Sequence, residues 1–166
     1  MRVHKEHRIE CTPQRFFELM FDPEVERRMS IEGMGNQDLQ LLERSVDRSP
    51  WRMRCRITPR DNLPGFVRKL VGAVFTLEEE RTYQPGTDQA QGTMTPSALR
   101  DKVRMVYTLR LVPEGHGACR RIMDWEVEVR LFGVGGSIEQ FAAAEIERGL
   151  DASARFLNQL LRTQTA

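Results

Sequence analysis

Cysteine is scarce in this sequence, and the three that occur lie far apart. Cys11, Cys55 and Cys119 are odd in number and show no CxxC spacing, which argues against a disulfide framework and against a structural zinc site. The three histidines are also widely separated, with no HxH or HExxH pattern, so we expect no metal site. This cysteine usage indicates a reducing, cytoplasmic environment.

Long apolar runs and cofactor motifs are also missing. No stretch approaches the roughly 20 apolar residues of a membrane span, and residues 1–7 lack the apolar region of a signal peptide. We therefore expect a chain that is neither exported nor anchored. No GxSxG, P-loop or GxGxxG motif occurs, and the glycine run at 133–136 lacks the strand–helix–strand context of a dinucleotide site. No cofactor is predicted.

Neither sign of charge is in clear excess. Twenty-five Lys plus Arg stand against 24 Asp plus Glu, a formal net charge of +1, which gives no electrostatic footprint for nucleic acid. What is present is typical of a globular protein, with 40% hydrophobic and 30% charged residues. The length fits a single domain, residues 1–166, large enough to bury a core and still enclose a pocket.

The pattern of residues predicts a strand, two short helices and then a series of strands. Residues 3–11 alternate as a strand does, and Thr12-Pro13 is typical of an N-cap followed by the first helical residue. Asp22-Pro23 should end this helix before a second one through Val25 to Met29. Strands are then expected at about 37–47, 51–58, 75–84, 91–96, 102–112 and 118–131.

Alternation assigns the faces of these strands. In 51–57 the odd positions are apolar and the even ones are Arg52, Arg54 and Arg56, so the arginines should face solvent. The odd positions of 103–111 and 123–131 should face inward in the same way.

Polar residues on the inward faces deserve separate consideration, because burying one without a partner costs roughly 1–3 kcal/mol. They are His7, Glu79, Arg81 and Tyr107. Glu79 and Arg81 could form a buried pair or bind the polar head of a ligand, unless a register slip exposes both. His7 could act as a general base if it faces a cavity near Tyr107, although a lone strand histidine is more often structural.

The last element is predicted to be a long helix. Ser137 and Gln140 have the spacing of a capping box, which predicts a helix of about 25 residues reaching roughly Arg162. One face of this helix is apolar and should lie on the sheet; it is formed by Ile138, Ala142, Ile146, Leu150, Leu157, Leu160 and Leu161. Small residues such as Gly149 interrupt the face, either for close packing or to leave room for a ligand.

This order of elements resembles that of the helix-grip, or START-like (SRPBCC), superfamily. In addition, residues 129–139, VRLFGVGGSIE, resemble the strand–glycine–helix junction P-L-x-G-G-x-I-E of a START-like bacterial family, DUF2505. The match departs from that pattern at Arg130, where the pattern has proline, and by an extra residue around Val134. The resemblance implies an α+β fold in which a curved antiparallel sheet wraps around the long C-terminal helix and encloses an apolar cavity.

Residues 63–75, between two predicted strands, are both apolar and basic. Phe66, Val67, Leu70, Val71 and Val74 fit one face of a short amphipathic helix, flanked by Arg68 and Lys69. In START-like proteins such insertions cover the cavity mouth, so the resemblance makes this segment a candidate lid and a candidate for transient membrane contact. The alternative is a helix packed on the rim of the sheet.

Three functions are compatible with these features. The first is binding or transfer of a hydrophobic small molecule, lipid-like or polyketide-like, in the cavity. Its expected lining is Met53, Phe66, Leu70, Glu79, Arg81, Met105, Tyr107, Met123, Trp125, Ile146, Gly149 and Leu150. The second is a cyclase or dehydratase in which His7, Glu79 or Tyr107 moves a proton. The third is a protein-interaction module that uses the arginines of 51–57.

Overall fold

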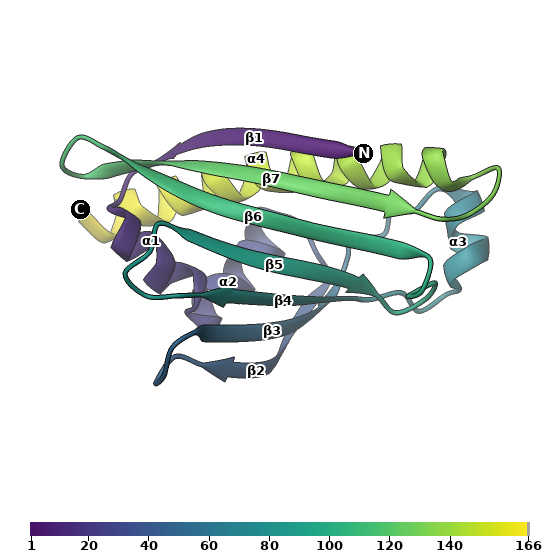
Figure 1. Cartoon of the computed structure of the whole chain (residues 1–166), viewed down its shortest axis with the longest axis horizontal. Helices are drawn as coiled ribbons and strands as arrows, with labels where there is room; N and C mark the ends of the chain where they lie inside the picture. Colours follow the sequence, from purple (N-terminus) through teal and green to yellow (C-terminus); the bar gives the residue numbers. More distant parts are fainter. Residues whose placement is uncertain (166) are drawn as a thin grey trace.

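A computed structural model describes residues 1–165, in which a curved sheet partly surrounds a long helix (Figure 1). The elements are, in chain order, β1 (Arg2–Ile9), α1 (Pro13–Met20), α2 (Pro23–Arg28), a wider helical turn η1 (Met29–Gly33), β2 (Asp38–Ser45), β3 (Trp51–Thr58), α3 (Gly65–Val71), β4 (Leu77–Tyr83), β5 (Gln89–Pro96), β6 (Val103–Glu114), β7 (Ala118–Val129) and α4 (Gly135–Thr165). No helix within residues 1–165 combines the length and the apolar character needed to span a bilayer.

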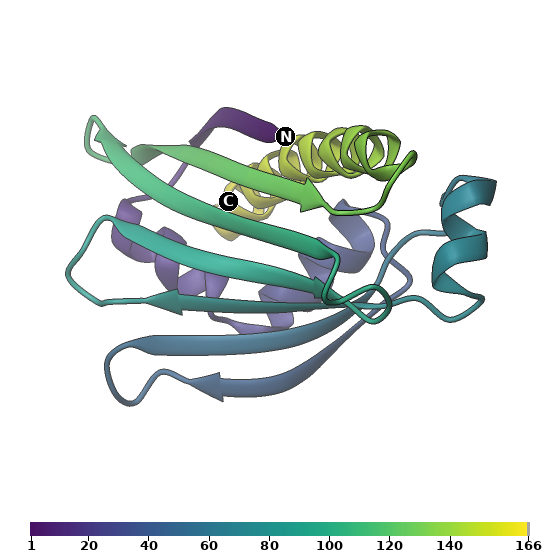
Figure 2. The same cartoon turned by 45° about the vertical axis from the view of Figure 1, so that its right-hand side comes forward.

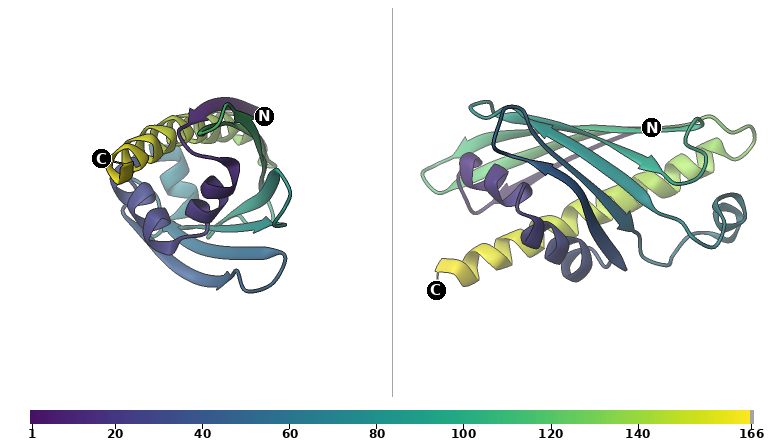
Figure 3. Two further views of the ribbon diagram at one scale, coloured as in Figure 1. Left: turned by 90° about the vertical axis from the view of Figure 1, so that its left-hand side faces the viewer. Right: turned by 90° about the horizontal axis from the view of Figure 1, so that it is seen from below.

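The strands form one antiparallel sheet in the order β1-β7-β6-β5-β4-β3-β2. The view along the molecule shows this sheet curving around an interior, with α4 against the β1 and β7 side and with α2 next to β2 (Figure 3). The helix-grip fold predicted from the sequence is therefore confirmed. The arrangement leaves the inner sheet face, α4 and the α1–α2 unit as the walls of the interior.

The first N-terminal helix begins where the sequence predicts, whereas the second begins at Pro23, two residues before the predicted Val25. The Thr12 side chain accepts a hydrogen bond from the Arg15 amide at 3.3 Å, and Asp22 accepts from the amide of Glu24 at 2.9 Å. Both are N-caps followed by proline at the first helical position, whose fixed φ suits a helix start. These caps fix where α1 turns into α2, and thereby bring the α2 residue Glu26 over the sheet.

The start of α4 differs from the sequence prediction. The helix begins at Gly135, so Ser137 lies within its first turn and is not the N-cap, and the helix is 31 residues long. The reason is the tight turn after β7. A Cβ at Gly135 would lie only 2.5 Å from the Val129 carbonyl oxygen, so the chain can turn this closely only at glycine. The Glu139 carboxylate also holds the turn, because it accepts from the Val129 amide at 2.9 Å.

Candidate functional site

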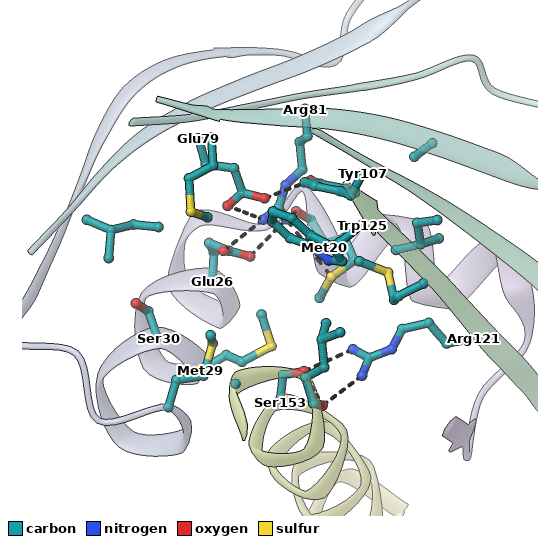
Figure 4. A pocket seen from close by; sticks show the side chains of 18 of the residues that line it. Met20, Glu26, Met29, Ser30, Glu79, Arg81, Tyr107, Arg121, Trp125 and Ser153 are labelled. Atoms are coloured by element: carbon teal, nitrogen blue, oxygen red, sulfur yellow. Dashed lines mark hydrogen bonds and ion pairs between the residues drawn. The ribbon is translucent and has the colours of Figure 1, made fainter. Parts of the chain in front are cut away.

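A cavity of about 110 Å³ lies in the interior, between the inner face of the sheet, α4, α1 and the α2–η1 unit. Its wall is mainly apolar, and it is unusually rich in methionine: Met20, Met29, Met34, Met94 and Met123 all border it. Methionine side chains have three rotatable bonds and adapt easily to the shape of a partner. Few polar side chains reach the cavity (Figure 4). Ser30 and Asn36 bond to each other at 3.0 Å, and the others belong to two larger groups.

The first polar group is a buried network around Arg81. Its guanidinium binds both oxygens of Glu26, at 2.9 and 3.0 Å, and one oxygen of Glu79 at 2.9 Å. The Tyr107 hydroxyl donates to the other Glu79 oxygen at 2.7 Å. The backbone carbonyl of Met20 accepts a further bond from Arg81 at 2.7 Å. The sequence left open whether Glu79 and Arg81 are buried or are exposed by a register slip. The structure buries both, and they form a pair.

Burial changes the proton affinities in this network. Desolvation raises the pKa of Glu26, although the charge of Arg81 pulls it down, and the neighbouring Glu79 raises it further. Burial likewise raises the pKa of Tyr107 well above its ordinary value, with Glu79 adding to the effect. For Arg81, burial lowers the pKa but Glu26 and Glu79 more than compensate, so the guanidinium stays charged. One cation thus faces two carboxyl groups in this network.

The second polar group is centred on Arg121 of β7. Its guanidinium donates to the Ser153 hydroxyl at 3.0 Å, to the Leu150 carbonyl at 2.8 Å and to Nδ1 of His7 at 3.0 Å. Since Nδ1 of His7 accepts here, its proton is on Nε2, which faces Asp151 at 2.7 Å. Burial lowers the pKa of His7, with the charge of Arg121 contributing, so the ring is neutral near pH 7.

His7 therefore does not fit the role of a cavity base. It does not border the cavity but lies behind Arg121, and the Tyr107 hydroxyl is engaged with Glu79. The alternation of β1 places His7 on the inner face as expected, but Arg121, directly opposite on β7, fills the space between the imidazole and the cavity.

The structure brings part of the predicted lining to the cavity and leaves part of it elsewhere. The predicted residues that border it are Glu79, Arg81, Tyr107, Met123, Trp125, Gly149 and Leu150. Met53 and Met105 are buried core residues that do not border the cavity, and Ile146 packs against that core. The prediction for these three was wrong because alternation determines which face a residue occupies, and not whether neighbouring elements fill the space above it.

The segment predicted as a lid does not cover the cavity. Helix α3 projects from one end of the molecule, away from α1 and α2 (Figure 2). Among the apolar residues predicted for the lid, only Val67 is buried, while Phe66 and Leu70 are each 41% exposed and Val74, just after the helix, is 84% exposed. None of these residues borders the cavity. Assigning Phe66 and Leu70 to the lining was therefore wrong, because the loops on either side hold α3 beyond the ends of the strands.

The outer face of the sheet carries paired charges. Arg52, Arg54 and Arg56 alternate with buried residues, as the sequence predicts. Each has an acidic neighbour: Arg52 contacts Glu80, Arg54 lies 3.8 Å from Glu43, and Arg56 lies 2.9 Å from Glu78. The arginines are therefore neutralised within the sheet and do not form a free cationic surface.

Several residues at the cavity were missed by the sequence analysis. Arg121 has the same odd parity as Met123 and Trp125, so extending that alternation by two residues would have found it. Gly92 was a second unused signal, because a glycine within a strand often marks a close approach by another group. Here a Cβ at Gly92 would overlap the Tyr107 ring. Glu26 gave no such signal, because a glutamate on a short charged helix is normally exposed.

Comparison with known families assigns the chain to one of them. The family described as "Protein of unknown function (DUF2505)" matches residues 4–161, which is nearly the whole chain. The chain belongs to the DUF2505 family. Among curated proteins, none matches this sequence.

Solved structures share the fold of this DUF2505 protein. The Zhui aromatase/cyclase of Streptomyces sp. R1128 has a TM-score of 0.72 and 11% identity, with 100% of this chain and 96% of that chain covered. Norcoclaurine synthase of Thalictrum flavum, in complex with dopamine and hydroxybenzaldehyde, has a TM-score of 0.68 and 14% identity over 98% and 87%. A START superfamily protein of Mycobacterium smegmatis has a TM-score of 0.63 and 17% identity over 96% and 98%. At these identities the likeness establishes the fold alone.

Proposed function

We propose that this DUF2505 protein binds a hydrophobic small molecule in the cavity between the sheet and α4. The observation that supports this most directly is the cavity itself, with its apolar, methionine-rich wall and few convergent polar groups. A packed core would contain no such space, because protein interiors are usually filled to the density of organic crystals.

The volume of the cavity limits the size of its occupant. About 110 Å³ is somewhat less than the cavity of roughly 150 Å³ that binds benzene in a small protein, and well below the roughly 300–1,000 Å³ of drug-sized sites. A single ring or the end of a chain is therefore the natural occupant. A lipid-like or polyketide-like ligand requires Met34 and the other methionines to move aside, which their flexibility permits.

Toluene is the simplest probe of this proposal. We expect the protein to bind toluene in a calorimetric titration, and purified protein to release a defined apolar molecule on extraction. Gly149→Leu adds a side chain at the cavity wall and should weaken the binding of toluene, whereas Ala144→Leu adds the same side chain at an exposed position of α4 and should not. Equal affinity in both variants, or no binding by the wild type, would refute the proposal.

A second candidate function is an enzyme of the cyclase or dehydratase type. It is favoured by the Glu26–Arg81–Glu79–Tyr107 network, because clusters of buried groups with shifted pKa values are frequent at catalytic sites. Two of the fold relatives also carry enzyme names. The test is turnover of the extracted ligand by Tyr107→Phe and Glu79→Gln variants. Unchanged turnover in both would eliminate these residues as acid–base groups and leave the binding function.

Transfer of a ligand between membranes would require a membrane contact, for which α3 is our candidate. Phe66 and Leu70 of α3, and Val74 just after it, are exposed near Lys69, a combination that favours an interface with anionic lipid, whereas Arg68 is paired with Asp61. The test is sedimentation with anionic vesicles. Val74→Asp should reduce the bound fraction, and Val112→Asp, at another exposed apolar position, should not.

A further inference from the structure

The cavity wall carries N–H donors that have no acceptor. Within residues 1–165, the buried side-chain atoms without a hydrogen-bond partner are Nε of Arg54, Arg60 and Arg121 and Nε1 of Trp125. All of them are donors, and Arg121 and Trp125 border the cavity. No buried side-chain oxygen in the described residues is in the same condition. A ligand that satisfies this wall must therefore supply acceptors, because a buried donor without a partner is costly.

Arg121 is also a buried cation whose direct partners are all neutral. It is 3% exposed, and its bonds go to the Ser153 hydroxyl, the Leu150 carbonyl and the unprotonated nitrogen of His7. The nearby acid, Asp151, binds Lys5 at 2.9 Å and His7 at 2.7 Å instead. A charge buried in this way is stabilised strongly by an opposite charge with good geometry. Arg121 is thus arranged to receive an anion.

The Arg81 group on the cavity wall has no free positive charge for an anion. Arg81 there already holds two acids, Glu26 and Glu79, so no positive charge is left over. The two groups lie on different sides of the cavity, and apolar side chains lie between them (Figure 4). This polarity fixes the orientation of a bound molecule, with its anionic end at Arg121 and its apolar part directed away from it.

We infer that the natural ligand class is a small apolar carboxylic acid, bound through its carboxylate to Arg121, with an apolar or aromatic body against Met123 and Trp125. This rests on the proposed function, since it names the chemical class of molecule that the cavity binds. A second oxygen on such a ligand would find a donor in the Trp125 indole N–H. Arg121 is a binding residue in this account, and no covalent step is implied.

The test compares probes of similar shape and different charge. Benzoate and nitrobenzene have nearly the same outline, but only benzoate is anionic. We expect the wild-type protein to bind benzoate at least about tenfold more tightly than nitrobenzene, the ratio typical of one hydrogen bond between charged groups. Arg121→Met should abolish this preference, because methionine offers the carboxylate neither a charge nor an N–H donor. Arg120→Met, the neighbouring arginine on the outer face, should retain the preference.

Each outcome of this comparison has a distinct meaning. Toluene binding with no preference for benzoate would overturn the inference and leave the proposed function standing. Failure to bind toluene, nitrobenzene or benzoate would overturn both. If Arg121→Met does not fold, the wild-type ratio together with Arg121→Lys, which keeps the charge and should keep the preference, still decides between these results.

Discussion

Replacing Arg81 by methionine is the perturbation that tests the buried network most severely. The substitution keeps an apolar side chain of similar length but removes the cation that holds Glu26 and Glu79. Both acids are almost fully buried, at 4% and 8% exposure, so neither can turn toward water without opening α2 or β4. The variant therefore leaves two carboxyl groups facing each other in the interior.

The expected loss of stability is large. Removing one partner of a buried ion pair typically costs about 3–5 kcal/mol, because the remaining charge is desolvated and uncompensated. For a protein of this size, each kcal/mol corresponds to roughly 2–4 °C in Tm, so the midpoint should fall by roughly 6–20 °C. Arg52→Met is the matched control. Arg52 pairs with Glu80 on the exposed face of the adjacent strand, and the substitution should leave Tm nearly unchanged.

The loss should also depend on pH. Without Arg81, the attraction that lowers the pKa of Glu26 disappears, while burial continues to raise it. A group whose pKa is raised on folding contributes stability below its unfolded pKa, and that stability is lost as the pH rises through the folded value. Arg81→Met should therefore be destabilised less at pH 5 than at pH 8, relative to the wild type.

Urea denaturation of both variants at pH 5, 6.5 and 8 measures these effects. Adding Glu26→Gln and Glu79→Gln to Arg81→Met should recover most of the lost stability, since no unpaired charge remains. If Arg81→Met costs less than about 1 kcal/mol at pH 8, or if its cost is the same at all three pH values, the reasoning about the network is wrong.

Two further substitutions probe the walls of the cavity. Gly92→Ala places a methyl group against the ring of Tyr107 and should cost about 1–3 kcal/mol in urea denaturation, because the ring must leave Glu79. Gly149→Ala brings a Cβ within 2.9 Å of the terminal methyl of Met34, a flexible group that can move. We expect a gain of up to about 1 kcal/mol in unfolding free energy from helix propensity, and weaker toluene binding by calorimetry.

The architecture could be predicted from the sequence because it depends on local patterns. The period-two alternation in β3, β6 and β7 gave the correct inward faces, and the cap Thr12 gave the start of the first helix. The start of α4 could not be predicted in this way. Ser137 has the sequence of a cap, but the contact of Gly135 with the Val129 carbonyl places the helix start three residues earlier.

The site was only partly predictable because it depends on how distant elements meet. Glu79, Arg81 and Tyr107 were identified as inward-facing polar residues, and they share one network. Their essential partner, Glu26, comes from α2, and no periodicity places that helix over β4. The opposite error occurred with Phe66 and Leu70, whose amphipathic pattern is real but whose helix lies beyond the sheet.

The methionines of this protein offer a direct test of where a ligand binds. Of its eight methionines, Met20, Met29, Met34, Met94 and Met123 border the cavity, whereas Met1, Met53 and Met105 do not. The second set therefore serves as an internal control within one spectrum. Protein labelled with carbon-13 at the methionine methyl groups reports on both sets at once.

Titration of this labelled protein with toluene is the measurement that tests the central claim most directly. If the cavity is the binding site, the methyl signals of Met20, Met29, Met34, Met94 and Met123 should shift together with a single affinity, and those of Met1, Met53 and Met105 should stay in place. Shifts of similar size in both sets, or no shift in the cavity set at saturating toluene, would contradict the account.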